Sequence, residues 1–171
     1  MADKLLIAVL GNRNSGKSTT WNKLFEYNDK GETVRTGVCL RYLYLSKAQW
    51  VNDVFLISGS PEERGIPIEK IIPKKLSPTI VLCSIQHVEE MKSTFGYFFN
   101  RGYDVFVQWL NPGHSDEGVI IDKLNIVDWL IGKGAILAKR NGKRPIDDRV
   151  EEIRQQILGW ATYRDLVKTE F

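Results

Sequence analysis

Residues 4–24 read KLLIAVLGNRNSGKSTTWNKL, and the fold can be predicted from this segment outward. It begins with an apolar run, residues 4–10, that ends at Gly11, and this length with a glycine boundary predicts a buried β-strand. Residues 16–27 carry apolar side chains on one side, which predicts a short helix. The sequence therefore predicts a strand, a glycine-rich loop and a helix in direct succession.

The loop between this strand and helix, residues 11–19, matches the pattern GxxxxGK[ST]. Glycines let backbone N–H groups turn inward around phosphate oxygens, and Lys17 supplies positive charge to the β- and γ-phosphates. Ser18 offers a hydroxyl to Mg²⁺, while the positive end of the helix points at the phosphates. We therefore expect a nucleotide site in which Lys17 has a catalytic role and Ser18 binds the metal, formed by Asn12, Asn14, Ser15, Gly16, Lys17, Ser18 and Thr19.

The rest of the chain alternates predicted strands and helices. Strands at 38–45 and 54–57 are joined too closely for a helical crossover, so we expect an antiparallel hairpin. Further strands are expected at 79–85, 104–110 and 135–138, and helices at 61–72, from 88 to the Arg101-Gly102 turn, at 119–131 and from about 146. The pattern predicts one α/β domain over residues 1–171, a three-layer P-loop NTPase with a six-stranded, mostly parallel sheet and one antiparallel edge strand.

Composition is that of an ordinary globular chain. Among 171 residues, 43% are hydrophobic and 26% are charged, which argues against disordered, collagen-like and coiled-coil classes. The longest aliphatic run, residues 5–10, is far short of the about 20 residues that span a bilayer, and the start lacks a signal-peptide pattern. We therefore expect a cytoplasmic protein with no membrane span. The net charge of +3 and basic clusters at 74–75 and 139–144 leave RNA open as a partner.

Residues 11–24, GNRNSGKSTTWNKL, resemble the G1 segment G-x-x-N-x-G-K-S-[ST]-x-x-N-x-L of Era-type and Obg-type GTPases. The order of elements, with its hairpin, is similar to the Ras-like GTPase fold. The resemblance implies a small Mg²⁺-dependent GTPase that binds GTP and GDP and acts as a switch. It also implies a protein effector or regulator that reads the loops 28–37 and 58–65.

Further site residues follow from the same resemblance. Thr36, with Thr33 as a substitute, would reach Mg²⁺ and the γ-phosphate, which makes Thr36 both a metal ligand and a catalytic residue. Asn14 matches an asparagine that coordinates K⁺ in some relatives. Leu137-Ala138-Lys139 resembles the S-A-K motif, so the backbone of Ala138 and Lys139 would touch the guanine ring.

Two GTPase motifs are degenerate. The G3 aspartate is replaced by Ile57, with Glu62 and Glu63 as the nearest carboxylates that follow, and Pro61 stands where Ras-like members carry a water-orienting glutamine. We therefore expect slow hydrolysis. The G4 motif retains only Asn111, with Asp116 as a substitute carboxylate for guanine recognition.

Three functions stay open. Intact Lys17 and Ser18 favour a slow GTPase switch, whereas Ile57 and Pro61 favour a pseudo-GTPase that serves as a binding or scaffold module. An ATP-using P-loop enzyme, such as a small-molecule kinase, would share the loop, but the hairpin and the lack of an arginine-rich lid argue against it.

Overall fold

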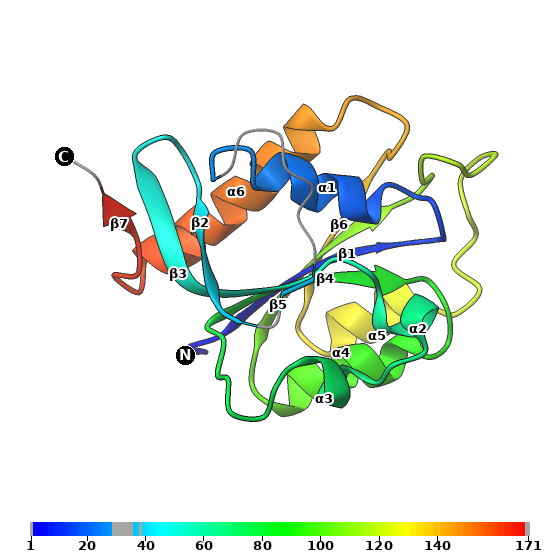
Figure 1. The fold of residues 1–171 in the computed structure, drawn as a ribbon. Coiled ribbons are helices and arrows are strands. Elements are labelled where there is room, and N and C mark those ends of the chain that lie inside the picture. The colour runs from blue at the N-terminus through cyan, green and yellow to red at the C-terminus, as the bar shows by residue number, and fades with distance from the viewer. Residues whose placement is uncertain (1, 29–35, 38, 170–171) are drawn as a thin grey trace.

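Seven strands form one sheet in the computed structural model of the protein, which describes residues 2–28, 36–37 and 39–169 (Figure 1). The strand order is β2-β3-β4-β1-β5-β6, and β7 pairs with β3. The β2 and β7 strands run antiparallel to β3, and the other pairs are parallel. The strands are β1 Leu5–Gly11, β2 Arg41–Tyr44, β3 Gln49–Ile57, β4 Ile80–Gln86, β5 Asp104–Leu110, β6 Ile136–Arg140 and β7 Lys168–Thr169.

Helices cover both faces of the sheet, which confirms the predicted α/β fold with a mostly parallel sheet. In Figure 1, α1 and α6 lie on one face and the other helices lie on the opposite face. The helices are α1 Lys17–Leu24, α2 Pro61–Arg64, α3 Ile68–Ile71, α4 Met91–Asn100, α5 Ile126–Gly132 and α6 Asp147–Thr162. Within the described chain, no helix combines the length and apolar character needed to cross a membrane.

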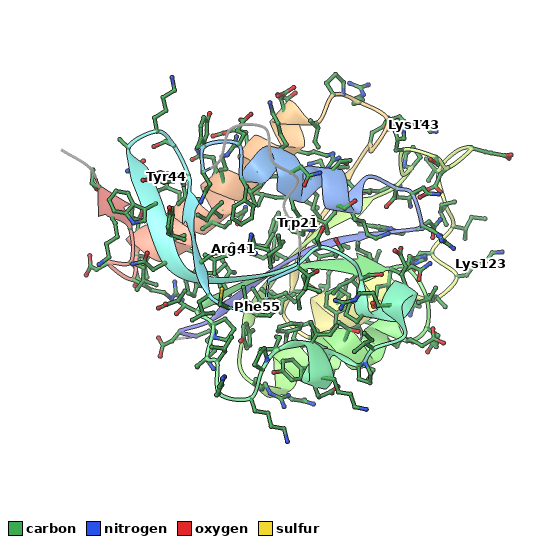
Figure 2. All side chains as sticks on the ribbon, viewed as in Figure 1. Trp21, Arg41, Tyr44, Phe55, Lys123 and Lys143 are labelled. Atoms are coloured by element: carbon green, nitrogen blue, oxygen red, sulfur yellow. The ribbon has the colours of Figure 1, made fainter. Side chains whose placement is uncertain are left out.

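The β1 strand shows why the apolar run at residues 4–10 is continuous. Leu6, Ala8 and Leu10 pack with residues of α3, α4 and α5, whereas Leu5, Ile7 and Val9 pack with residues of α1 and α6. Because side chains alternate along a strand, a strand buried on both faces needs apolar residues at every position. Figure 2 shows Trp21 and Phe55 on opposite faces of the sheet, one in each hydrophobic cluster.

The predicted strand count of six is wrong, and so is the expectation of a single antiparallel strand. After α6 the chain turns back, and β7 pairs antiparallel with Gln49 and Trp50 of β3. A two-residue strand is too short for any alternation of apolar and polar residues, so its sequence carries no recognisable pattern.

Two predicted helices are shorter than expected. The helix expected at 61–72 divides into α2 and α3, because Gly65 adopts a left-handed conformation with φ 63° and Pro67 precedes the first residue of α3. The helix expected at 119–131 begins only at Ile126, where the Asp122 carboxylate accepts hydrogen bonds from the N–H groups of Ile126 and Val127 at 2.9 and 3.0 Å. This carboxylate satisfies free donors at the helix start and fixes where the helix begins.

Trp21 joins α1 to the sheet. Its side chain is fully buried, and its indole Nε1 donates a hydrogen bond of 2.8 Å to Ser84 Oγ on β4. We expect Trp21→Phe to lower the free energy of unfolding by about 2 kcal/mol, because the change leaves a small void and removes the partner of a buried hydroxyl. Denaturant unfolding measures this loss. Trp160→Phe is the matched control. The Trp160 indole donates a hydrogen bond of 2.8 Å to Asp104 that is exposed to solvent. This substitution should therefore lower the free energy of unfolding by less than about 1 kcal/mol. Equal losses would contradict the assigned role of Trp21.

Candidate functional site

The carboxyl end of β1 lies near the middle of the sheet, between β4 and β5. Parallel strands bring their carboxyl ends to one edge, and ligands of open α/β sheets bind outside that edge. The 11–19 loop begins there and leads into α1. Gly16 has φ 102°, a conformation that a side chain would strain, and a Cβ atom on Gly11 would lie only 2.3 Å from Ser15 Oγ. These two glycines explain how the loop turns so tightly.

Carbonyl oxygens of the 11–19 loop are already occupied by the protein. Lys17 Nζ donates to Gly11 O at 3.1 Å and to Asn12 O at 2.7 Å. The N–H groups of Ser115 and His114 donate to Asn14 O and Ser15 O at 3.2 and 3.0 Å. With its acceptors engaged in this way, the loop has backbone donors, together with the N-terminus of α1, to offer to an anion.

The Lys17 ammonium is enclosed, with only 6% of its side chain exposed, and it forms an ion pair of 3.0 Å with Glu63 Oε1. Glu63 lies on α2, directly after β3. Because β4 lies between β1 and β3, the end of β3 is not next to the 11–19 loop. The α2 helix, which follows β3, places the Glu63 carboxylate in contact with Lys17 of that loop. Of the two carboxylates considered from the sequence, Glu63 is thus the one in contact with Lys17.

Two cavities adjoin the loop. The lysine cavity, of about 210 Å³, is lined by Asn14, Ser15, Gly16, Lys17, Ser18, Ser58, Gly59 and Glu63. The arginine cavity, of about 570 Å³, is lined by Asn14, Gly16, Ser18, Thr19, His114, Ser115, Gly142, Arg144, Ile146 and Arg149. They share Asn14, Gly16 and Ser18, so they are two neighbouring parts of one site. A polar cavity beside a larger one fits a ligand with an anionic end and a bulkier body.

Arg149, at the start of α6, was not among the predicted site residues. Arg149 is 6% exposed. Its Nη1 donates a hydrogen bond to Thr20 Oγ1, and its Nη2 donates a longer one, of 3.5 Å, to Gly16 O. Burial lowers the pKa of this guanidinium to about 10. Among the described residues no carboxylate forms an ion pair with it. A buried cation without a counter-ion raises the affinity of the arginine cavity for anions.

The metal ligands expected from the sequence are connected to the same cavity, Ser18 directly and Thr36 through Ser58. Ser18 lines the lysine cavity, and Thr36 Oγ1 accepts a hydrogen bond of 2.9 Å from the N–H of Ser58, which lines the same cavity. Thr33 lies outside the described residues. The described residues contain no cluster of three or more His, Cys, Asp or Glu side chains that could hold a metal ion by themselves. Ser18 and Glu63 fit Mg²⁺ bound together with phosphate, since that ion takes few protein ligands and completes its shell with phosphate oxygens and water.

The residues expected to recognise guanine do not line either cavity. The Asn111 amide is nearly fully buried and is bonded to the Ile120 backbone, as donor at 2.9 Å and as acceptor at 2.6 Å. Ala138 and Lys139 lie on β6, beside β5. Asp116 accepts hydrogen bonds from the Gly113 N–H at 2.7 Å and from Asn12 Nδ2 at 3.3 Å. In this structure Asn111 fixes the loop after β5 internally, and Asp116 joins that loop to Asn12 of the 11–19 loop.

Two glycines outside the motif make this contact between loops close. A Cβ atom on Gly113 would lie 2.4 Å from Ser15 Cβ, and one on Gly142 would lie 2.9 Å from Ser15 O. The loops after β5 and β6 are therefore in direct contact with the 11–19 loop at Ser15. Glycine alone is too common a residue for the sequence to have indicated these contacts.

Comparison of the chain with models of known protein families, with curated proteins and with solved structures gives no match.

Proposed function

We propose that this chain is a small P-loop NTPase that binds a Mg²⁺-nucleoside triphosphate at the 11–19 loop. The observation that carries the proposal is the Lys17 ammonium, which is enclosed by the loop. Its partners among the described residues are two carbonyl oxygens of the loop, which a γ-phosphate can join, and the Glu63 carboxylate, which it can replace. Incoming phosphate oxygens would take the place of the Glu63 carboxylate at Lys17. The backbone donors of the loop and the N-terminus of α1 would bind the remaining phosphate oxygens.

Ser18 and Glu63, with Thr36 nearby, would hold Mg²⁺, which neutralises charge on the β- and γ-phosphates when bound. K⁺ beside Asn14 is part of the same proposal, because Asn14 lines both cavities. The nucleoside would occupy the larger arginine cavity, where the positive charge of Arg149 would attract the phosphate next to the sugar. Hydrolysis would be slow, because Pro61 provides no group that orients water.

A switch function is supported by the contacts between the two expected effector loops. Glu63 belongs to the 58–65 segment, and Ser58 of that segment bonds to Thr36 of the 28–37 segment. A γ-phosphate that displaces Glu63 and draws Thr36 toward Mg²⁺ would change both segments together. A protein effector or regulator would read this change.

Guanine as the preferred base rests on the resemblance of residues 11–24 to Era-type and Obg-type GTPases. The side chains of Asn111 and Asp116 already make hydrogen bonds within the protein, and this is the observation that supports the ATP-using alternative. Titration of nucleotide-free protein with fluorescent GTP and ATP analogues, with and without Mg²⁺, tests both points. We expect saturable, Mg²⁺-dependent binding that is tighter for GTP. Equal affinities would overturn the guanine preference, and no binding of either nucleotide would overturn the proposal and leave a scaffold.

The Lys17–Glu63 ion pair predicts an unusual variant. We expect Glu63→Gln to raise the affinity for nucleotide without Mg²⁺ about fivefold to tenfold, because the carboxylate no longer competes with phosphate for Lys17. The gain in affinity on adding Mg²⁺ should shrink, since a metal ligand is lost. Glu89→Gln, which breaks an exposed pair with Lys92, should leave both affinities unchanged. Weaker binding of Mg²⁺-free nucleotide to Glu63→Gln would contradict this account.

A further inference from the structure

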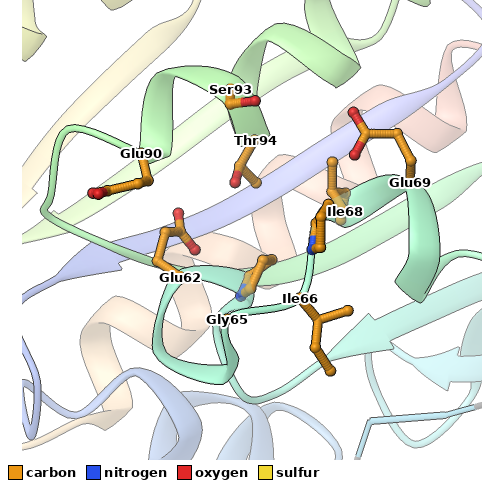
Figure 3. A pocket seen from close by; sticks show the side chains of 10 residues that line it. Glu62, Gly65, Ile66, Ile68, Glu69, Glu90, Ser93 and Thr94 are labelled. Carbon is orange, nitrogen blue, oxygen red and sulfur yellow. The ribbon is translucent and has the colours of Figure 1, made fainter.

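A third cavity, of about 340 Å³, lies between α2, α3 and the start of α4 (Figure 3). It shares no lining residue with the lysine or arginine cavity. Pro61, Ile66, Pro67 and Ile68 give it apolar walls. We call it the glutamate cavity, after the three glutamates that line it. Its size is at the lower end of the range for small-molecule sites, about 300 to 1,000 Å³.

The charged side chains that line the glutamate cavity are all carboxylates. Glu62 comes from α2, Glu69 from α3 and Glu90 from the residue before α4, and no Lys, Arg or His is among the described lining residues. Ser93 and Thr94 add hydroxyl groups. A cavity with apolar walls and one sign of charge selects ligands of the opposite sign that also carry an apolar part.

Among the described residues that line this cavity, Glu62 has buried oxygen atoms without a hydrogen-bond partner. Both carboxylate oxygens are buried and make no hydrogen bond in the described structure. Figure 3 shows the side chain pointing from α2 toward Glu90 and Thr94 at the start of α4. An ionised carboxylate in such a place is costly unless a cation or a donor joins it.

Among the described residues, no positive charge compensates Glu62 from the elements packed around it. The titratable groups near it are Glu63 on its own helix, the Cys83 thiol on β4, Glu69 on α3 and Glu90 beside α4. Burial, with a smaller contribution from Glu63, raises the pKa of Glu62 to about 7, although polar groups of Thr94 and Gln86 partly oppose this rise. The Glu62 carboxylate therefore has no cationic partner among the residues that the structure describes.

We propose that the glutamate cavity binds a small organic cation, a primary ammonium or guanidinium group on a short aliphatic chain. The cationic group donates hydrogen bonds to Glu62 and is attracted by Glu69 and Glu90, while the chain lies along Ile66, Ile68 and the prolines. An anion is repelled by the three carboxylates. A neutral alcohol gains the apolar contacts but not the charge interaction. This site is distinct from the nucleotide site, because Glu63, the next residue on α2, faces Lys17 instead.

Isothermal titration calorimetry at pH 8 with three probes of matched chain length tests the proposal: n-butylamine, n-butanol and butyrate. We expect n-butylamine to bind with a Kd of about 1 mM and n-butanol and butyrate to bind at least about tenfold more weakly. Glu62→Gln should weaken n-butylamine binding about tenfold, whereas Glu89→Gln, outside the cavity, should not change it. Each of three results would overturn the proposal: the alcohol binds as tightly as the amine, Glu62→Gln binds the amine as tightly as the natural chain, or the amine shows no saturable binding up to about 50 mM.

Discussion

Replacement of Lys17 by methionine is expected to lower the affinity for Mg²⁺-nucleoside triphosphate at least about 100-fold, because the γ-phosphate loses a charge-assisted hydrogen bond in an enclosed site. Methionine keeps most of the aliphatic length, so the change removes the ammonium with little loss of packing. Equilibrium titration with a fluorescent triphosphate analogue measures the effect. Unfolding curves recorded on the same samples separate a loss of affinity from a loss of fold.

Lys23→Met is the matched control for this experiment. Lys23 lies on the same helix, but its side chain is 35% exposed and pairs with Glu26 and Asp147. The same loss of charge there should change nucleotide affinity by less than about twofold, because exposed charges are well screened. If Lys17→Met and Lys23→Met bind equally well, Lys17 does not bind phosphate in this protein.

Glu62→Gln is expected to stabilise the protein, by an amount that depends on pH. The folded-state pKa of Glu62, about 7, is raised above the ordinary value of 4.5, so the folded chain holds a proton that the unfolded chain releases between those values. Stability therefore falls as the pH rises from 4.5 to 7, and stays at the lower level above 7. Glutamine keeps the shape of the side chain and removes the cost of burying its charge. We expect Glu62→Gln to raise the free energy of unfolding by about 2 to 3 kcal/mol at pH 8 and by less than about 1 kcal/mol at pH 5.

Urea unfolding of both proteins at the two pH values measures this difference. Glu89→Gln is the control, since its carboxylate is exposed and pairs only with Lys92, and its effect should stay within about 1 kcal/mol at both pH values. A Glu62→Gln variant that is less stable than the natural chain at pH 8 would show that the ionised carboxylate has a partner in the folded protein.

Strands buried on both faces were the elements that the sequence predicted best. The β1 and β5 strands lie within one residue of their predicted bounds, because continuous burial requires an uninterrupted apolar run. Elements fixed by single contacts were harder to predict. The β7 strand depends on pairing with a distant strand, and the start of α5 depends on one carboxylate, Asp122.

The candidate site was predictable where one local pattern contains its residues. The pattern at residues 11–19 indicates Lys17 and Ser18 because their spacing along the loop is fixed. Glu62 and Glu63 could not be told apart, since neighbours on a helix point about 100° apart and only the packing of α2 decides which one faces Lys17. Arg149 could have been noticed: it lies four and eight residues before Ile153 and Ile157, on the buried side of its helix.

A crystal structure of the protein with Mg²⁺ and a non-hydrolysable GTP analogue would show whether the 11–19 loop binds nucleotide. We expect the triphosphate to lie within the 11–19 loop, Lys17 Nζ to have left Glu63 for the β- and γ-phosphate oxygens, and Mg²⁺ to contact Ser18. The nucleoside should occupy the cavity beside Arg149. A structure in which the nucleotide binds elsewhere, while Lys17 keeps its contact with Glu63, would show that the 11–19 loop is not the nucleotide site.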